Sequence, residues 1–512
     1  MIKTHFKYDQ MKIKYLLINL IFTLIVSPLH AQFTNVLIDN SSNPEEPSIV
    51  INPKNPLQIA AGSNIYNSYY STDGGATWIT GFLNSSLTVY GDPCLVADSS
   101  GNFFYFHLVQ GIDKIVCQKS TDGGVTYNDG SYTSNNNFLL EDKEWAAVDP
   151  TNNNIYVTWT EYDNGFNPGP TDSSRIYFAK STDNGLTFTS GLRICQYAGD
   201  CLYLDITDPH PFVGPSGEVY VTFMDSNGIR FNRSLDTGNT WLSQQPLIES
   251  GGDYRYNVLS GVTRIRTMPY SSCDKSNSPY RGNLYVSWAD QRNGINNSDV
   301  FIIKSSDGGT TWTNALKVNS DSSNLHQYRN AMAVDQTNGY IYIVYYDRRN
   351  YPDNDTSDVY ISKSTDGGDH WIDYKISNEG FYSDGGTFDG DYIDIAAHAG
   401  IVRPIWTTIN NFSSGVWTSL YDESTVGIET YNSVNNNFNF SMNPNPASLF
   451  AVMSFTNEIN NLDGVIMDAS GRSLINFKIN HTRVKILDLQ NLSSGLYFIK
   501  AGNVTKKLFV GK

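Results

Sequence analysis

Positive charge is scarce in this 512-residue sequence, and the shortage narrows the class of partner. Lys and Arg together number 35 against 51 Asp and Glu, which gives a formal net charge of −16 at pH 7. A protein that binds nucleic acid needs a basic surface to neutralise phosphates, and anionic membranes attract basic segments. The balance argues against both partners. An anionic substrate would need its own cluster of arginines.

Cysteine is also rare. Five Cys are present and no two of them have CxxC spacing, so a zinc site of the usual kind is not predicted. Cys195 and Cys201 bracket a short loop and form the candidate disulfide. The other three, Cys94, Cys117 and Cys273, leave an odd thiol.

Long apolar runs are missing, apart from one near the start of the chain. The run at residues 15–26 follows Lys12 and Lys14 and precedes Ala31, a small residue at a cleavage position. It is too short for a membrane span, and this order of residues is typical of an export signal. We therefore expect a signal peptide at residues 1–31 and no transmembrane span in the mature chain.

One octapeptide is abundant. STDGGATW at residues 71–78 recurs, with variation, at residues 120–127, 181–188, 234–241, 305–312 and 364–371. Each copy has Ser first, Asp third, Gly fifth and an aromatic residue eighth. Asp can accept hydrogen bonds from turn amides, and Gly adopts the positive φ that other residues resist. Each copy is predicted to be a hairpin turn whose last residue starts the returning strand and packs between sheets.

The octapeptide resembles the Asp-box, or bacterial neuraminidase repeat, of the sialidase superfamily of β-propellers. The resemblance implies an all-β propeller over residues 32–423 and a structural role for Asp73, Asp122, Asp183, Asp236, Asp307 and Asp366. A calcium-loop interpretation competes, because Asp and Gly also mark such loops. The copies lack the alternating carboxylates and the distal Glu that calcium loops have.

The number of blades follows from a count of first strands. These are expected at residues 47–51, 93–97, 145–149, 211–213, 262–268, 331–335 and 392–397. The seventh unit has no octapeptide, and the isolated strand at residues 34–38 can supply its missing fourth strand. Closing the ring with a strand from the other end of the chain removes exposed sheet edges. We favour seven blades, with six as the alternative.

The composition changes after the propeller. Residues 424–440 are rich in Asn and are predicted to be a linker. The following segment carries, in order, NPNPA at 443–447, GVIMDASGR at 464–472, LSSGLYFIK at 492–500 and two lysines at 506–507. Over residues 441–512 it resembles the C-terminal sorting domain of the type IX secretion system of Gram-negative bacteria.

The resemblance implies that this machinery is a partner and that the protein crosses the outer membrane to the cell surface or the medium. It also implies a small C-terminal β domain. A plain β-sandwich binding module is the alternative, but it would not explain the ordered landmarks.

Polar residues gather in the loops that enter the first strands and in those that join second to third strands. Candidate binding residues there are Asp92, Asp208, His210, Arg292 and Arg348. Carboxylates and arginines on one concave face suit a glycosidase or a glycan-binding surface. The structural alternative is that the similar segments 288–292 and 345–349 form salt-bridge corners within a blade. His210 is interpreted as a loop residue rather than a metal ligand.

The sialidase resemblance implies three arginines around a substrate carboxylate, a Tyr–Glu nucleophile pair and an acidic Asp. Arg329, Tyr392 and Glu144 are the candidate catalytic residues. Residues 45–50 read EEPSIV, without the Arg-Ile-Pro motif of the family, and Arg266 is expected within a strand. The sequence therefore favours a propeller that binds an extracellular glycan or glycoprotein without sialidase chemistry. An exo-acting glycoside hydrolase is the alternative.

Hard oxygen ligands gather at Asp389, Asp391 and Asp394, which is the candidate calcium site. Three carboxylates on one short segment are also typical of a solvated loop. The sequence has no Gly-rich phosphate loop and no nucleophile-elbow serine, and no other cofactor is predicted.

Overall fold

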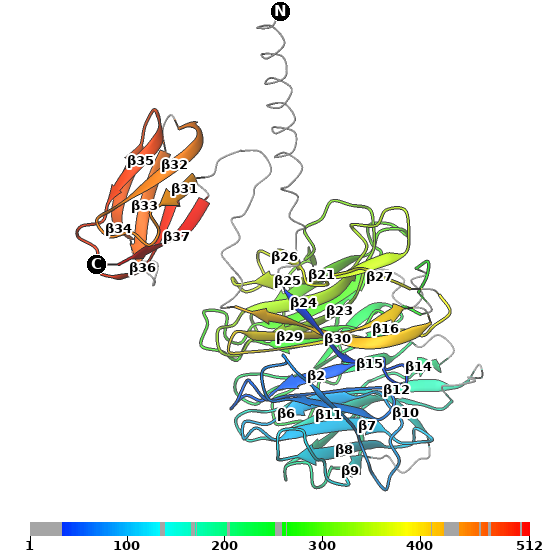
Figure 1. Cartoon of the computed structure of the whole chain (residues 1–512). Helices are drawn as coiled ribbons and strands as arrows, with labels where there is room; N and C mark the ends of the chain where they lie inside the picture. Colours follow the sequence, from blue (N-terminus) through cyan, green and yellow to red (C-terminus); the bar gives the residue numbers. More distant parts are fainter. Residues whose placement is uncertain are drawn as a thin grey trace, which may run out of the picture. The chain divides into compact units, whose positions relative to one another are not determined.

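The computed structural model describes residues 33–133, 139–164, 169, 171–201, 205–250, 259–262, 264–383, 385–410, 412–423, 440–459, 462–468, 473–501 and 504–511. The chain divides into two compact units, Met1–Glu423 and Ser424–Lys512. Every regular element among the described residues is a β-strand (Figure 1), so the all-β class is confirmed. The expected signal peptide and the expected linker up to residue 439 lie outside the described residues.

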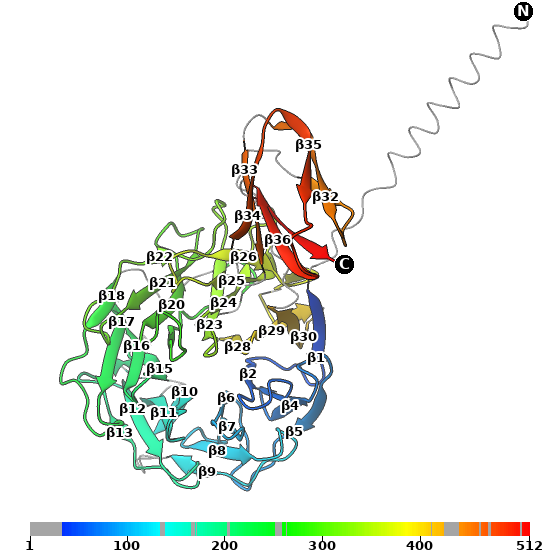
Figure 2. The same ribbon diagram turned by 90° about the vertical axis from the view of Figure 1, so that its left-hand side faces the viewer.

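The described part of the first unit contains seven antiparallel sheets, which follow one another around a ring (Figure 2). Sheet 1 is β2 (Ser48–Ile51), β3 (Ile59–Ser63), β4 (Asn67–Ser71) and β5 (Ile79–Phe82). Sheet 2 is β6 (Cys94–Ala97), β7 (Phe103–Leu108), β8 (Ile115–Ser120) and β9 (Ser131–Thr133). Sheet 3 is β10 (Leu140–Val148), β11 (Ile155–Tyr162), β12 (Ser173–Ser181) and β13 (Leu192–Arg193), with β14 (Gly199–Asp200) also on β12.

The ring continues with the same plan. Sheet 4 is β15 (Thr207–Val213), β16 (Val219–Asp225), β17 (Gly228–Ser234) and β18 (Leu247–Ser250). Sheet 5 is β19 (Tyr270–Cys273), β20 (Leu284–Asp290), β21 (Asp299–Ser305) and β22 (Leu316–Lys317). Sheet 6 is β23 (Gln327–Val334), β24 (Ile341–Asp347), β25 (Thr356–Ser364) and β26 (Ile372–Lys375), with β27 (Phe381–Tyr382) also on β25. Sheet 7 is β28 (Asp394–His398), β29 (Ile401–Asn410), β30 (Ser413–Asp422) and β1 (Thr34–Asp39).

Sheet 7 is completed from the start of the chain. β1 pairs antiparallel with β30, with Leu37 opposite Trp417. The strand expected at residues 34–38 therefore lies where the sequence places it, as the fourth strand of the last sheet. Because one sheet holds both ends of the unit, the ring has no free sheet edge at its closure.

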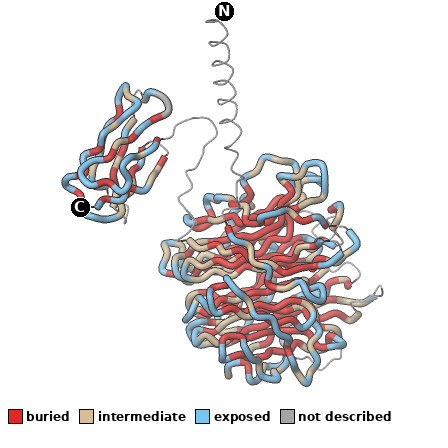
Figure 3. The backbone as a smooth tube through the Cα atoms, viewed as in Figure 1, coloured by how far each residue is buried: buried red, intermediate tan, exposed pale blue. Residues whose placement is uncertain are grey.

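The core lies between neighbouring sheets. All residues of β7, β11, β20 and β24 are buried, because each second strand has another sheet against both of its faces. Figure 3 shows that buried segments fill the interior of this unit and that exposed segments lie mainly in its loops. This explains why the second strands are almost continuously apolar instead of alternating.

The six octapeptides turn from the third strand to the fourth with one set of hydrogen bonds. In the first, Ser71 Oγ donates to Asp73 Oδ1 (2.8 Å) and accepts from Gly75 N (2.8 Å), while Thr77 N donates to Asp73 Oδ1 (2.9 Å). The other copies repeat these contacts. The fifth-position glycines have φ between 78 and 91°, the conformation predicted for them.

One first strand was wrongly predicted. In sheet 5 the innermost strand is Tyr270–Cys273, whereas the sequence indicated residues 262–268. The alternation around Arg264 and Arg266 resembles a strand, but both side chains reach carboxylates at the axis. The two arginines therefore alternate because both form ion pairs across the ring, and not because they lie on one face of a strand. Arg266 belongs to the loop that enters sheet 5.

The candidate disulfide is also corrected, because Cys195 and Cys201 are both free. Cys195 Sγ accepts a hydrogen bond from Ile176 N (3.3 Å), whereas Cys201 N donates to Asp172 O (3.0 Å). The two cysteines are therefore held against different residues of the chain around β12, and each thiol stays free.

The second unit is a two-sheet domain with its own core. One sheet is β31 (Phe440–Asn443), β32 (Phe450–Ile459) and β35 (Thr482–Asp488), and the other is β34 (Ser473–Ile479), β33 (Leu462–Asp468), β36 (Gly495–Ala501) and β37 (Val504–Val510). Met453, Ile466, Ile499 and Leu508 are buried in one cluster that both sheets share. The C-terminal β-sandwich expected from the sequence is therefore present.

Candidate functional site: a charged axial face

One backbone feature, repeated from sheet to sheet, builds the face of the ring on which the first strands begin. Register shifts place Lys143, Asp208 and Arg329 in β-bulges of β10, β15 and β23. Glu46 and Asp92 hold the corresponding position, two residues before β2 and β6. All five have φ between 48 and 56°, which is uncommon for a residue with a Cβ. A bulge re-aims its side chain, and here five sheets direct a charged residue to the axis.

Lys143 is the centre of the resulting cluster. Its Nζ lies 2.8 Å from Asp92 Oδ2, 3.1 Å from Asp391 Oδ2 and 3.8 Å from Glu46 Oε1. Burial alone would lower the pKa of Lys143, but the surrounding carboxylates outweigh it and raise the pKa well above its ordinary value. These residues come from sheets 1, 2 and 3 and from the loop entering sheet 7, so one buried ammonium ties four parts of the ring together.

The arginines of the face are all paired with carboxylates of the protein. Arg329 forms a two-pronged pair with Asp389, with Nη1 2.7 Å from Oδ2 and Nη2 2.8 Å from Oδ1. Arg266 Nη2 lies 3.3 Å from Asp208 Oδ1. Arg264 Nε donates to Asp391 Oδ1 at 2.6 Å. Such charge-assisted contacts neutralise each guanidinium within the protein, although Arg329 Nε has no hydrogen-bond partner among the described residues and the side chain of Arg264 stays half-exposed.

Asp391 forms ion pairs with three cations of the cluster, Lys143, Arg264 and Arg266. Burial would raise the pKa of this carboxyl, but Lys143, Arg266 and Arg264 hold it well below its usual range. Asp391 is therefore ionised at any physiological pH, and it is the common partner of the cations contributed by sheet 3 and by the loop entering sheet 5.

Three half-buried carboxyls differ in protonation. Burial raises the pKa of Glu45 to about 7 and that of Asp142 to about 6. Burial acts in the same direction on Asp92, but Lys143 outweighs it and lowers the pKa of that carboxyl. Asp142 hydrogen-bonds with Asp92 through its side chain. Neighbouring carboxyls whose pKa values are pushed apart can serve as an acid and a base.

An aromatic layer lies beneath the charges. Trp145 packs against His210, Tyr270 and Tyr392 with ring centroids 5.2, 5.4 and 5.4 Å away. Trp145 and His210 follow the bulged residues Lys143 and Asp208 by two positions. Burial lowers the pKa of His210 to about 3, so its imidazole is neutral. The rings form a plug across the axis under the charged cluster.

The candidate catalytic residues lie at two depths. Arg329 belongs to the charged cluster, whereas Tyr392 and Glu144 are buried at the level of the plug. The Tyr392 hydroxyl donates to the carbonyl of Pro93 (3.3 Å). Burial raises the pKa of Glu144, whose carboxyl oxygens have no hydrogen-bond partner on another described residue. Tyr392 and Glu144 therefore do not form a hydrogen-bonded pair.

Of the candidate binding residues, Asp92 and Asp208 lie in the cluster and His210 in the plug. His210 was wrongly predicted to be a loop residue, since it lies in β15 and pairs with Thr222. The other two lie in separate ion pairs: Arg292 contacts Asp290 (2.6 Å), and Arg348 contacts Asp355 (3.0 Å). Arg349 pairs in turn with Asp347 (2.6 Å), so the predicted salt-bridge corners of segments 288–292 and 345–349 are confirmed.

The three carboxylates of the candidate calcium site have different partners. Asp389 pairs with Arg329, Asp391 pairs with Lys143, Arg264 and Arg266, and Asp394 accepts from Ser48 Oγ (2.9 Å) and Ile49 N (3.0 Å). Within the described ranges, no group of His, Cys, Asp and Glu is arranged to hold a metal ion. A search of the same residues for a helix able to cross a membrane also found none.

Sequence reasoning missed Lys143, Arg264 and Arg266 as members of the site. A usable signal was present: Pro47, Pro93 and Pro209 each directly follow the residue with positive φ. Pro269 holds the same position in sheet 5. Aligning it with the other prolines would have started the fifth first strand at residue 270 and moved both arginines into the entering loop.

Comparison with known families identifies the second unit. A model described as the secretion system C-terminal sorting domain matches residues 441–510. The match agrees with the landmarks in the sequence and indicates export through the type IX system to the cell surface or the extracellular space. A search of curated proteins found no match.

Several solved propellers are similar to the chain in outline. A sialidase of Trypanosoma rangeli shares 11% identity over 83% of this chain and 85% of its own, with a TM-score of 0.40. An α-L-arabinanase of Penicillium chrysogenum shares 16% over 61% and 93%, with a TM-score of 0.41. A GH74 xyloglucanase of Xanthomonas campestris shares 12% over 83% and 60%, with a TM-score of 0.43. Likenesses of this strength carry no argument about activity.

Proposed function

We propose that this exported propeller binds a neutral glycan at its axial face and does not cleave sialosides. The observation that supports this is the pairing of the arginines. Arg264, Arg266 and Arg329 are each held by an aspartate of the protein. An anionic sugar would have to displace one of these internal carboxylates before it gained a cation.

The charge of the face supports the same proposal. Its carboxyl groups outnumber its cations even without Glu46, whose pKa is raised well above its ordinary value by burial. The other carboxyls are Glu45, Asp92, Asp142, Asp208, Asp389 and Asp391, against the cations Lys143, Arg264, Arg266 and Arg329. A surface of this sign repels anions. The half-buried carboxyls can accept hydrogen bonds from sugar hydroxyls when ionised, so a neutral glycan matches the chemistry of the face better than a sialoside does.

The proposal is tested by glycan-array binding together with a hydrolysis screen on fluorogenic glycosides that includes sialosides. We expect binding to neutral glycans and no turnover of sialosides. Asp142→Asn should weaken neutral-glycan binding about tenfold. Arg193→Ala, at an exposed position of sheet 3, is the control. Sialoside turnover that disappears in Arg264→Ala, with folding intact, would contradict the proposal.

A glycoside hydrolase acting on neutral sugars is the second candidate. It is favoured by the carboxyls Asp142 and Asp92, whose pKa values are shifted in opposite directions. Protonated Asp142 would donate its proton to the leaving oxygen, while a water molecule attacks the anomeric carbon from the other face of the sugar and releases its proton to solvent. Ionised Asp92 is hydrogen-bonded to Asp142, too close for the two carboxyls to flank the scissile bond, so its part is to hold Asp142 in place.

This candidate has a distinct signature in the same screen. Turnover of a neutral glycoside should fall as pH rises through about 6, where Asp142 loses its proton. Asp142→Asn should abolish the turnover while neutral-glycan binding remains measurable. If neutral glycans bind and no glycoside is hydrolysed, the result supports the binding function and excludes the hydrolase.

A further inference from the structure

A second concave site lies between sheets 6 and 7, away from the charged cluster. Its cavity has a volume of about 700 Å³, within the range of small-molecule sites. The residues that line it are Asn35, Ser377, Asn378, Glu379, Gly380, Phe381, Tyr382, Trp406, Thr408, Ile409, Asn410, Phe412 and Trp417. The wall from sheet 7 combines strands from both ends of the propeller, so the cavity exists only after β1 has closed the ring.

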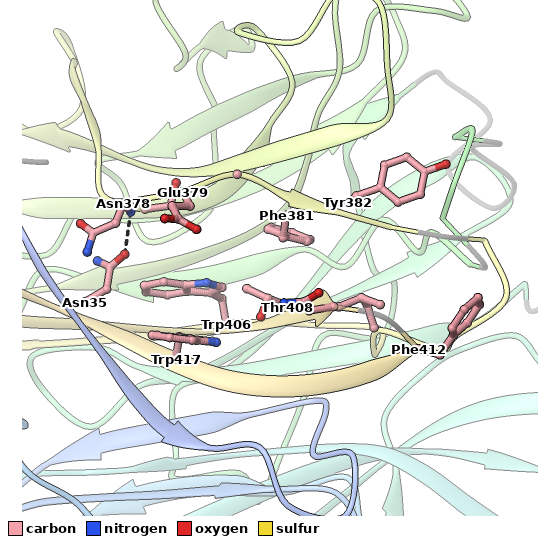
Figure 4. A pocket seen from close by; sticks show the side chains of 13 residues that line it. Asn35, Asn378, Glu379, Phe381, Tyr382, Trp406, Thr408, Phe412 and Trp417 are labelled. Atoms are coloured by element: carbon pink, nitrogen blue, oxygen red, sulfur yellow. Dashed lines mark hydrogen bonds between the residues drawn. The ribbon is translucent and has the colours of Figure 1, made fainter. Parts of the chain in front are cut away.

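One wall is aromatic. Trp406 of β29 stands directly opposite Trp417 of β30 in the antiparallel pair, so both indoles project from the same face of sheet 7. Figure 4 shows the two rings on one side of the cavity, facing Asn378, Glu379 and Phe381 on the other. Trp406 is only 2% exposed, and its indole N–H makes no hydrogen bond to any described residue. An N–H without a protein partner on the wall of a cavity is available to a ligand.

The opposite wall is held in place by an amide. Asn35 Nδ2 donates to Ile376 O (2.7 Å), and Asn35 Oδ1 accepts from Asn378 N (2.7 Å). The clamp fixes the segment after β26 at a set distance from β1. Glu379 projects from this wall (Figure 4), and its carboxylate forms no ion pair or hydrogen bond within the described residues. Acceptors and donors therefore remain free on both walls.

The mouth of the cavity exposes two further rings. Phe412 is 75% and Tyr382 54% exposed, and Figure 4 places both at the end away from Asn35. Large aromatic side chains left this open are common at binding sites. They extend the aromatic surface of the tryptophans outward, which suits a ligand longer than a single ring.

We propose that this cavity binds a short neutral saccharide. Flat indole and phenyl faces can cover the apolar face of a sugar ring, while Asn378, Thr408 and Glu379 can meet its hydroxyls. Glu379 is the only residue with a formal charge in the described lining, so the described walls offer no cation to an anionic sugar. The site is separate from the axial face and does not depend on the function proposed there.

The test is binding of a panel of short neutral oligosaccharides to the full chain, followed by calorimetry and by tryptophan fluorescence. A saccharide in the cavity contacts Trp406 and Trp417 and changes their emission. We expect Phe412→Ala and Trp417→Ala to weaken binding about tenfold. The matched control is Phe82→Ala, a 67% exposed phenylalanine in sheet 1, which should bind as the wild type does. Thermal unfolding of each variant checks that it is folded. If Trp417→Ala does not fold, Phe412→Ala still tests the proposal, because Phe412 is exposed.

The outcomes separate this site from the axial one. Asp142→Asn should leave cavity binding unchanged, and Phe412→Ala should leave axial binding unchanged. The proposal is overturned if no oligosaccharide of the panel binds, or if binding is lost in Asp142→Asn and retained in Phe412→Ala. Binding of a proline-rich peptide at these aromatic residues, with no saccharide binding, would also overturn it.

Discussion

The two faces of the propeller use repetition in opposite ways. On the octapeptide face, six turns have the same Ser and Asp and the same hydrogen bond between them. On the axial face the backbone conformation repeats, but the side chains at the repeated position differ: Glu46, Asp92, Lys143, Asp208 and Arg329. Residues that are identical in every repeat indicate that each turn needs them to fold. Residues that differ on the same backbone conformation indicate that they are fixed by contacts across the ring or by a ligand.

The range of the contacts differs as well. The octapeptide Asp is bonded to residues two and four positions away, as in Asp73 with Ser71 and Thr77. At the axis, Lys143 bonds Asp92 over 51 residues, and Arg264 bonds Asp391 over 127. Local contacts form within one hairpin, whereas axial contacts form only when distant sheets meet. The contacts of Lys143 with Glu46 and Asp391 therefore need the sheets from both ends of the unit to be in place.

Removing the central cation should have the largest effect. Lys143→Met leaves Glu46, Asp92 and Asp391 without the ammonium they share, and an uncompensated buried charge typically costs about 3–5 kcal/mol. We expect a loss of this size in the free energy of unfolding, measured by chemical denaturation. Lys114→Met removes the half-exposed partner of Asp113 and should cost less than about 1 kcal/mol. Equal losses in the two variants would show that the axial cluster does not hold the ring.

A smaller and uniform effect is expected on the octapeptide face. Ser120→Ala and Ser305→Ala each remove a buried hydroxyl that accepts from a glycine N–H and donates to an aspartate. Leaving that N–H unpaired costs about 1–3 kcal/mol, and the two variants should agree closely. Ser243→Ala, at an exposed position, is the control in the same denaturation experiment. A large difference between the two turns would break the equivalence inferred from their shared hydrogen bonds.

The smallest effect is a pH dependence that arises from the axial face. Burial raises the pKa of Glu45 to about 7 and that of Asp142 to about 6. In the unfolded chain such carboxyls ionise near pH 4. From there to about pH 7 the folded state holds more protons, so stability should fall as pH rises through this window. The depressed pKa of Asp391 acts in the opposite direction, and its contribution is lost only on acidification below about pH 4.

Glu45→Gln should flatten this slope in the midpoint of thermal unfolding between pH 5 and 8. Glu379→Gln makes the same chemical change at an exposed carboxylate and should leave the slope as it is. If Glu45→Gln follows the wild type across the window, Glu45 does not carry the raised pKa.

Much of the fold could be read from short segments. The octapeptides predicted six hairpin turns because each turn is stabilised by its own residues. The closing strand could be anticipated because the last unit lacked a partner that β1 supplies. The first strand of sheet 5 could not be anticipated, because Arg264 and Arg266 alternate like strand residues but form ion pairs across the ring.

The sequence by itself determined the β class, the repeated turns and the sorting domain, because all three depend on residues close together in the chain. Only the tertiary structure decided that each axial arginine has an internal carboxylate, and that Glu144 and Tyr392 lie buried at the level of the plug. It also decided that Trp406 and Trp417 share a cavity with residues 377–382. The physical reason is the same in each case: these contacts join residues that are far apart in the sequence, and their partners are fixed only when the sheets close into a ring.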